Sequence, residues 1–209
     1  MDINIKTLTV GDLDENCYIC WDESLEAIVI DPGAEPDKII DFIKKNQLKI
    51  KYIINTHGHA DHISANDSIK NFSPNTQILI HKNDADFLSD PLKNLSFIVN
   101  QYSSFYKPDI ILDGDSVINF SNNNKMTVIE TPGHTPGSIC LLLNNKYLFS
   151  GDTLFFCSIG RTDLPHSLEN EMQKSLAKLK TLDKNIKVFP GHGRETSIGY
   201  ELANNYFLL

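Results

Sequence analysis

The feature that most limits how this chain can fold is a run of ligand-type side chains, His57-Gly58-His59-Ala60-Asp61-His62. It directly follows Lys51–Ile54, whose apolar residues predict a short buried strand. Three histidines and an aspartate packed together would repel one another when protonated, so they need a common cation. Imidazole and carboxylate groups are suitable ligands for zinc, iron and manganese. The fold must therefore present this loop at the end of a strand, where side chains can converge.

Three further loops carry candidate ligands of the same kind, and each follows a segment that predicts a strand. Glycine lies beside each of these candidates, and it permits tight turns and a close approach of the backbone. The sequence therefore predicts a metal-binding set drawn from four loops: His57, His59, Asp61, His62, His134, Asp152 and His192.

This set is about twice the number of ligands that one tetrahedral ion needs. It therefore predicts two divalent metal ions, with Zn²⁺ favoured and iron or manganese as alternatives. The remaining histidines, His81 and His166, stand alone in the sequence. They are interpreted as solvated or hydrogen-bonded residues rather than as ligands.

The rest of the chain alternates clusters of short strands with helices, in two successive rounds. Predicted strands cover residues 3–10, 17–21, 27–30, 51–54, 77–80, 116–120, 126–130, 138–143, 147–150 and 187–189. Predicted helices cover residues 35–46, 63–72, 83–88, 166–182 and 197–204, with Asn83 as the N-cap of the third. This order suggests two packed sheets with helices outside, in an α/β or α+β class.

Composition excludes several classes of function. The chain has 209 residues and a formal net charge of −8, and its longest Lys/Arg run is Lys44-Lys45. A phosphate-binding surface normally shows a basic stripe, so we expect no nucleic-acid partner. No apolar run approaches the ~20 residues of a membrane helix, and no signal peptide is evident. We therefore expect a cytoplasmic protein with no membrane partner, either a monomer or a homodimer.

Cys17 and Cys20 have the C-x-x-C spacing that is typical of a redox pair or of half a zinc site. They lie in an extended apolar segment, where residues three apart point to opposite faces of a strand. No second C-x-x-C completes a four-ligand site. The two residues are therefore interpreted as buried, reduced thiols.

Six short segments together resemble the metallo-β-lactamase superfamily, in its glyoxalase II-like (hydroxyacylglutathione hydrolase-like) branch. They are Asn16-Cys17-Tyr18, Asp31-Pro32-Gly33, Thr56–His62, Thr131–Gly137, Gly151–Phe155 and Phe189–Gly193. The resemblance covers nearly the whole chain, and the combination is far more specific than any one segment.

The resemblance implies a fold and a partition of the ligands. The implied fold is a four-layer αββα sandwich of two mixed sheets with helices outside, and the metals lie at one edge between the sheets. The implied first ion is held by His57, His59 and His134, and the second by Asp61, His62 and His192. Asp152 is implied to bridge the two ions.

The chain departs from full-length glyoxalase II enzymes in two respects. It is similar to short members of the branch, with Gly160-Arg161-Thr162-Asp163-Leu164-Pro165 as their signature. We therefore expect one domain over residues 1–209, without the C-terminal helical domain that helps those enzymes to bind glutathione. Arg161 and Arg194 stand where those enzymes carry a lysine and a tyrosine. These arginines could bind a substrate carboxylate, or could instead brace loops at the surface.

The predicted function is a binuclear metal-dependent hydrolase, a glyoxalase II-like thioesterase that acts on small hydroxyacyl-thiol substrates similar to S-lactoylglutathione. Asp61 is the candidate catalytic residue, because it can orient the attacking water or move its proton. Residues 91–108, with aromatic Phe97, Tyr102, Phe105 and Tyr106, and residues 159–163 are expected to form the substrate wall.

Two alternatives stay open at this point. One is a mononuclear iron persulfide dioxygenase, which would use His57, His134 and Asp152. The other is a metal-binding protein without catalytic activity.

Overall fold

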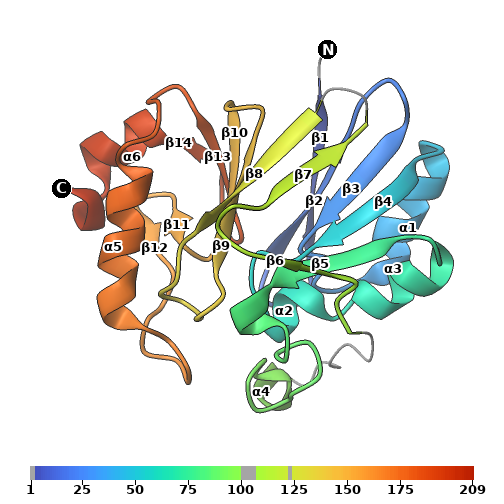
Figure 1. Cartoon of the computed structure of the whole chain (residues 1–209), viewed down its shortest axis with the longest axis horizontal. Helices are drawn as coiled ribbons and strands as arrows, with labels where there is room; N and C mark the ends of the chain where they lie inside the picture. Colours follow the sequence, from blue (N-terminus) through green and yellow to red (C-terminus); the bar gives the residue numbers. More distant parts are fainter. Residues whose placement is uncertain (1–2, 100–106, 122–123) are drawn as a thin grey trace.

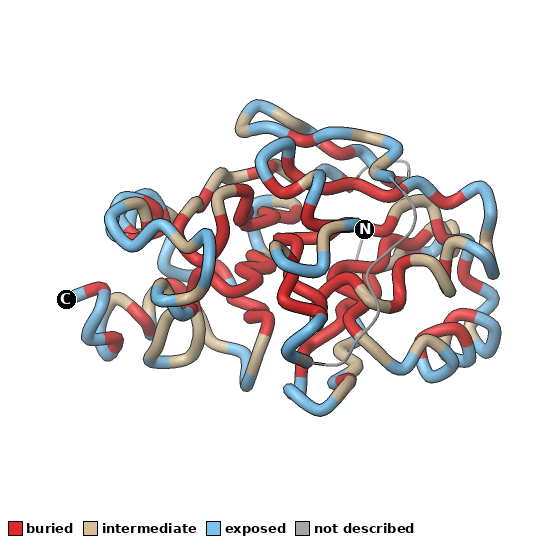
Figure 2. Tube along the Cα trace, turned by 90° about the horizontal axis from the view of Figure 1, so that it is seen from below, coloured by how far each residue is buried: buried red, intermediate tan, exposed pale blue. Residues whose placement is uncertain are grey.

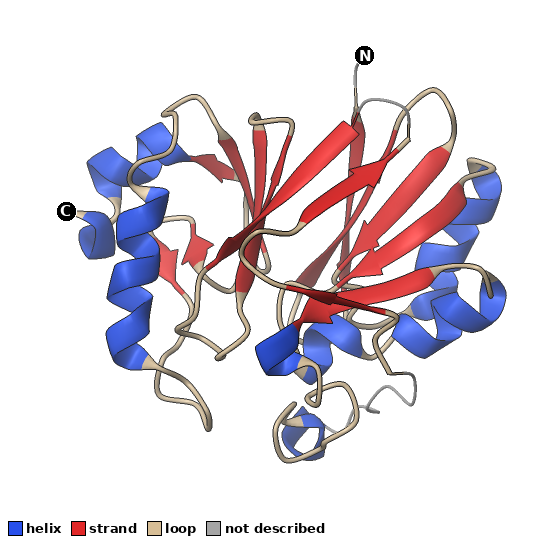
Figure 3. Ribbon diagram, viewed as in Figure 1, coloured by secondary structure: helices blue, strands red, loops and turns tan. Residues whose placement is uncertain are grey.

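Two six-stranded sheets face each other, and helices cover their outer faces (Figures 1 and 3). This computed structural model describes residues 3–99, 107–121 and 124–209. The arrangement confirms the predicted four-layer αββα sandwich of mixed sheets.

The first sheet has the strand order β1-β2-β3-β4-β5-β6. The strands are β1 (Asn4–Val10), β2 (Glu15–Trp21), β3 (Glu26–Ile30), β4 (Lys49–Ile54), β5 (Gln77–His81) and β6 (Ile110–Leu112). The first three pair antiparallel, whereas β3 to β6 pair in parallel. Parallel neighbours need crossover connections. α1 (Pro36–Lys45) connects β3 to β4, and α2 (Ala60–Ile63) and α3 (Asn66–Phe72) connect β4 to β5.

The second sheet has the order β14-β13-β10-β9-β8-β7. Its strands are β7 (Val117–Phe120), β8 (Asn124–Glu130), β9 (Ile139–Leu143), β10 (Tyr147–Gly151), β13 (Lys187–Pro190) and β14 (Thr196–Ser197). Only β10 and β13 pair in parallel, and α5 (Glu169–Leu179) connects them. Shorter elements are α4 (Ser96–Val99), β11 (Leu154–Phe155), β12 (Ser158–Ile159), α6 (Ile198–Asn204), and the 3₁₀ helices η1 (Lys82–Asp84) and η2 (Tyr206–Leu208).

Three apolar layers hold this sandwich together, and they appear as the buried interior of the trace in Figure 2. The central layer lies between the sheets and includes Tyr18, Ile54 and Phe149. One outer layer joins the first sheet to α1 and α3, and the other joins the second sheet to α5 and α6. Burial of apolar area in each layer is the main stabilising contribution, at about 25 cal/mol per Å².

The two cysteines of the C-x-x-C segment lie in different layers. Cys17 belongs to the layer under α1, and Cys20 belongs to the layer between the sheets. Both are fully buried and free, which confirms the interpretation as reduced thiols on opposite faces of a strand.

The predicted helix over residues 63–72 is wrong in its bounds, because the structure has two short helices there, α2 and α3. The hydroxyl of Ser64 donates to the carbonyl of Ala60 at 2.6 Å. The next amide, that of Ala65, bonds outside the helix to the carbonyl of Pro32 at 2.9 Å. This long-range bond ties the segment to the turn after β3 and ends the first helix.

The predicted helix over residues 83–88 is also wrong. Only the 3₁₀ helix η1 forms, and its cap is His81, whose Nδ1 accepts from the amide of Asn83 at 3.3 Å. Asn83 is therefore not the cap. Its side-chain amide instead donates to the carbonyl of Pro136.

The predicted helix over residues 166–182 begins three residues later, at the start of α5. The preceding turn is bound to the loop of a candidate ligand. The Ser167 hydroxyl donates to the carbonyl of His134, and the Leu168 amide donates to the carbonyl of Gly133, both at 2.7 Å. Because these contacts hold Ser167 and Leu168 against the His134 loop, the helix begins only at Glu169.

Within the described part of the chain, none of the helices is both long enough and apolar enough to cross a membrane.

Candidate metal centre

All seven predicted ligands lie at one edge of the sandwich, in the segments that follow β4, β8, β10 and β13. Five of them lie in loops, whereas Asp61 and His62 lie in the short helix α2. Tight packing of these loops depends on glycine. A β-carbon at Gly191 would lie 2.3 Å from Asp152 Oδ1, and Gly151 has a φ of +46° with a β-carbon position 2.3 Å from Thr56 Oγ1. Larger residues at these two positions would separate the loops.

The first group of side chains is His57, His59 and His134, all buried. Their ring nitrogens lie within 4.8 Å of one another, and Nδ1 of His59 is 2.8 Å from Nε2 of His134. Three imidazole nitrogens at this spacing can bind one cation.

The second group is Asp61, His62 and His192, again with ligand atoms within 4.8 Å of one another. Asp61 Oδ2 lies 3.3 Å from His192 Nε2 and 3.7 Å from His62 Nε2.

Asp152 lies between the two groups. Its Oδ1 is 3.4 Å from His62 Nε2, and its Oδ2 is 3.4 Å from His134 Nε2. Oδ2 also lies 3.8 Å from His192 Nε2 of the second group. The carboxylate therefore contacts both groups, as a bridging carboxylate requires.

Outer hydrogen bonds orient three of the histidines. Nδ1 of His134 donates to the carbonyl of Arg161 at 2.8 Å, and Nδ1 of His192 donates to the carbonyl of Leu13 at 3.0 Å. Nδ1 of His62 lies 3.1 Å from Asp31 Oδ2. A proton held on Nδ1 leaves the Nε2 lone pair free for a cation, so these partners fix the ligand tautomer.

Several atoms at the centre are buried without a hydrogen-bond partner: His57 Nε2, His62 Nε2 and Asp152 Oδ1. Leaving one such atom unsatisfied costs about 1–3 kcal/mol. The three face a common volume and offer lone pairs or negative charge, so the donor set fits divalent cations.

The pKa values of His57 and His59 favour neutral rings. Burial holds the pKa of His57 well below its usual range, and burial lowers the pKa of His59 to about 3. The lone pairs of these rings are therefore available without loss of a proton.

The carboxylates of the centre stay ionised. Burial opposes their charge, but His62 and the neighbouring histidines hold the pKa of Asp152 well below its usual range and also lower that of Asp61. In return, Asp61 and Asp152 outweigh the burial of His62 and raise its pKa well above the usual value.

Two buried aspartates support the centre from outside, and neither was among the predicted site residues. Asp31 accepts from the amide and the hydroxyl of Thr56, at 2.7 and 2.6 Å, in addition to its contact with His62. The Asp31-Pro32-Gly33 segment was part of the family resemblance, so a signal for this residue was present.

Asp84 connects two of the ligand loops. Its carboxylate accepts from the amides of Gly58 at 3.0 Å and Gly137 at 2.6 Å, and from the Thr135 hydroxyl at 2.6 Å. It lies far from both loops in the sequence, and no local motif marks it.

The two predicted substrate-binding arginines lie in different surroundings. Arg161 borders the cavity above the centre, and its Nε and Nη2 bind both oxygens of Asp163 at 2.8 and 2.9 Å. Arg194 stacks on the ring of Phe156 at 3.5 Å from its centroid.

The cavity over the centre has a volume of about 570 Å³, which suits a small ligand. Residues 159–163 border it through Ile159 and Arg161, as predicted for a wall. From residues 91–108, Leu95 and Ile98 line it, and Phe97 is an exposed neighbour. Tyr102, Phe105 and Tyr106 lie outside the described residues.

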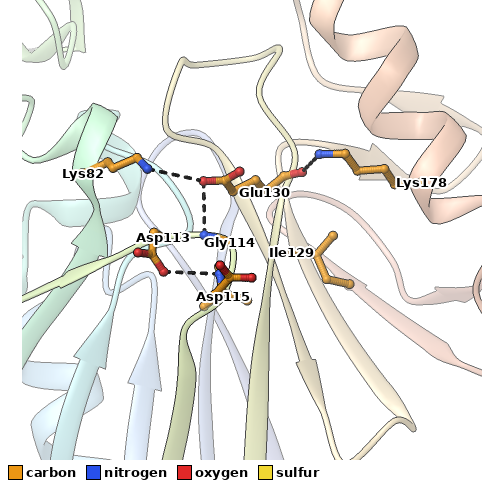
Figure 4. A pocket seen from close by; sticks show the side chains of 8 residues that line it. Lys82, Asp113, Gly114, Asp115, Ile129, Glu130 and Lys178 are labelled. Atoms are coloured by element: carbon orange, nitrogen blue, oxygen red, sulfur yellow. Dashed lines mark hydrogen bonds and ion pairs between the residues drawn. The ribbon is translucent and has the colours of Figure 1, made fainter.

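A second hollow, of about 450 Å³, lies away from the centre, beside β8 (Figure 4). Its charged groups bind one another. Glu130 Oε1 accepts from the amide of Gly114 at 3.1 Å and from His81 Nε2 at 2.8 Å, and Lys178 donates to the Glu130 carbonyl. His81 is thus a hydrogen-bonded residue outside the centre, as predicted.

Comparisons with known proteins agree with this geometry. A sequence model of the metallo-beta-lactamase superfamily matches residues 10–192. The hydroxyacylglutathione hydrolase GloC of Haemophilus influenzae is 33% identical, over 99% of this chain and 98% of that protein.

Two solved structures are similar over nearly the whole chain. The B3 metallo-beta-lactamase BLEG-1 has a TM-score of 0.93 and 32% identity, covering 98% of this chain and 99% of that one. TTHA1623, in a di-iron-bound form, has a TM-score of 0.86 and 29% identity, covering 97% and 100%.

Proposed function

Because this chain belongs to the metallo-β-lactamase superfamily, we propose that it is a two-metal hydrolase of small thioesters. The proposed substrates are hydroxyacyl thiols of the S-lactoylglutathione kind. The observation that carries this proposal is the convergence of seven ligand-type side chains, several with buried atoms that lack a hydrogen-bond partner.

The proposed first ion is held by His57, His59 and His134, and the proposed second ion by Asp61, His62 and His192. Asp152 is proposed to bridge them. The spacing of the ligand atoms and the two-sided position of Asp152 support this partition. Zinc is the proposed metal, because it accepts these nitrogen and oxygen ligands, with iron or manganese as the alternatives.

When bound, the two ions would supply a water of lowered pKa and would polarise the acyl carbonyl. The protein contributes the positioning of the reactants. Asp61 lines the cavity, and its carboxylate stays ionised, so it can orient the attacking water and accept its proton. The outer partners hold Nδ1 of His62, His134 and His192, so the Nε2 lone pair of each ring stays directed at the centre.

The thioester assignment rests on the likeness to GloC, whose name states hydroxyacylglutathione hydrolysis. A second candidate is hydrolysis of a β-lactam amide, favoured by the likeness to BLEG-1 at 32% identity. Both reactions add water to an acyl carbon, so the site geometry alone fits either.

The test is elemental analysis of metal-loaded protein, combined with three assays on that preparation. We expect about two transition-metal ions per chain, release of thiol from S-lactoylglutathione, and slow or no hydrolysis of nitrocefin. Faster turnover of nitrocefin than of every thioester would favour the β-lactam candidate. A single iron per chain with oxygen uptake in the presence of a persulfide would identify a dioxygenase instead. Full metal loading without any turnover would indicate a metal-binding protein.

A further inference from the structure

Among the described residues, the cavity wall beyond the candidate ligands is mostly apolar. It is formed by Leu13, Leu95, Ile98, Phe155, Ile159 and Leu164. Among the residues that the structure describes, the polar side chains of this wall are those of Asn94, Ser158 and Arg161.

These three polar side chains already have partners. Asn94 donates to the Phe87 carbonyl at 2.7 Å and accepts from the Ser96 amide at 3.0 Å. The Ser158 hydroxyl lies 3.5 Å from the carbonyl of Ile159. Asp163 forms a bidentate contact with Arg161. A substrate carboxylate would therefore have to compete with the carboxylate of Asp163.

Apolar surface begins directly at the ligands, on both sides of the centre. The ring of Phe155 lies 6.0 Å from that of His192, and the Leu13 carbonyl holds the same histidine. On the other side, the carbonyl of Asn94 accepts from the amide of Ala60, which places the Leu95 segment beside the ligand loop. A molecule whose carbonyl reaches the centre would therefore contact hydrocarbon in both directions.

We propose that the substrate is a thioester with an apolar acyl chain of several carbons and a thiol part without carboxylates. This inference rests on the proposed thioesterase function but changes the preferred substrate. S-lactoylglutathione, with a polar acyl group and two carboxylates on its thiol, would be hydrolysed without being preferred. In the reaction, the oxygen of water bonds to the acyl carbon and the carbon–sulfur bond breaks. The sulfur leaves with a proton as the free thiol, so one thioester and one water give one acid and one thiol.

The physical reason is the cost of placing charge against this wall. Glutathione carries two carboxylates, and burying a charge without a partner is unfavourable. An apolar chain gains from the same wall, and each methylene that it buries increases binding by about fourfold.

The test uses metal-loaded protein and two series of thioesters, one of N-acetylcysteamine and one of glutathione. Each series carries acetyl, butyryl, hexanoyl and octanoyl groups. We expect kcat/KM to rise about tenfold or more from acetyl to hexanoyl. At each chain length the uncharged carrier should be preferred by about tenfold. If kcat/KM did not change with chain length, or if the glutathione thioesters were preferred, the inference would be overturned but the thioesterase function would remain. Absence of hydrolysis for every thioester would instead remove the proposed function, and the inference with it.

A matched pair of variants tests the wall itself. Ile98 and Ile111 are similarly exposed, at 62% and 51%, but only Ile98 borders the cavity. Ile98→Lys should reduce the advantage of hexanoyl over acetyl severalfold and shift preference toward the glutathione series. Ile111→Lys should leave both ratios unchanged. Equal ratios in the two variants would show that this wall does not select the substrate.

Discussion

The cavity over the metal centre and the hollow beside β8 differ in what their polar atoms do. In the hollow beside β8, Glu130 binds Gly114, His81, Lys82 and Lys178 (Figure 4). At the metal centre, charged and polar atoms converge but leave lone pairs without partners inside the protein. A functional site is therefore recognised by buried polar groups that its own fold leaves unsatisfied, more than by the size of its cavity.

The largest effect should come from the residue that joins the two ligand groups. Asp152→Ala removes an oxygen from each side, so metal content and thioesterase activity should both fall, activity by at least about 100-fold. Elemental analysis and kcat/KM measure this. The control is His166→Ala, since His166 packs edge-on to Phe87 outside both groups. Equal losses in the two variants would show that the ligand partition is wrong.

The second effect is on stability. Chelation of both ions should leave the buried ligand atoms unsatisfied. It should also remove the stabilisation that bound metal gives to the folded state. One ion present at about 1,000 times its Kd stabilises by about 4 kcal/mol, so two ions together stabilise by about 8 kcal/mol. For a chain of this length, that corresponds to a fall in Tm of about 16–32 °C.

Differential scanning calorimetry with and without chelator measures this change. The Asp152→Ala protein is the control, because it should show a much smaller chelator effect. An unchanged Tm in the parent protein would mean that no tightly held ion is present.

The third effect concerns the connection between ligand loops. Asp84→Asn replaces an acceptor oxygen with a donor amide, although all three partners of Asp84 donate. One buried amide would then face another donor, at a cost of about 1–3 kcal/mol. We expect a lower Tm and weaker retention of the first ion on dialysis.

The control for this change is Asp86→Asn, two residues away. Asp86 is exposed and forms a surface ion pair with Lys93, so its loss should cost less than about 1 kcal/mol. If both variants retained metal equally well, Asp84 would have no part in positioning the ligands.

Much of this centre was predictable because its ligands are encoded locally. Histidines and aspartates follow strands in short glycine-containing segments, and that pattern is visible without any tertiary information. The supporting aspartates differ in this respect. Asp84 accepts hydrogen bonds from amides that lie 26 and 53 residues away in the sequence. These contacts become visible only in the folded chain.

The secondary structure follows the same rule. Long periodic segments such as α1 and α5 were predicted, whereas their ends depended on contacts elsewhere in the chain. Strand β6 was missed, because three residues next to Pro108 carry too short a pattern to show a period. The break between α2 and α3 was missed because it depends on a bond from Ala65 to Pro32.

The smallest effect should come from the second hollow, and it tests whether that hollow is only structural. The hydrogen bond from His81 holds the pKa of Glu130 below its usual range. A carboxylate with a lowered folded-state pKa stabilises the protein above its unfolded-state pKa of about 4.5. That stabilisation is lost as the pH falls through the folded-state value. Because Glu130 is more than a third exposed, its contribution should be below about 1 kcal/mol.

Glu130→Gln should therefore lower the free energy of unfolding slightly at pH 7, and the difference from the parent protein should shrink toward zero near pH 3. Acid acts on the metal ligands of both proteins alike, so its effect cancels in the difference. Denaturant unfolding at the two pH values measures it, with metal content and kcat/KM at pH 7 as controls that should not change. A difference that grows on acidification would contradict the assigned hydrogen bond between His81 and Glu130. A loss of activity at pH 7 would mean that this hollow, although its charges bind one another, takes part in the chemistry.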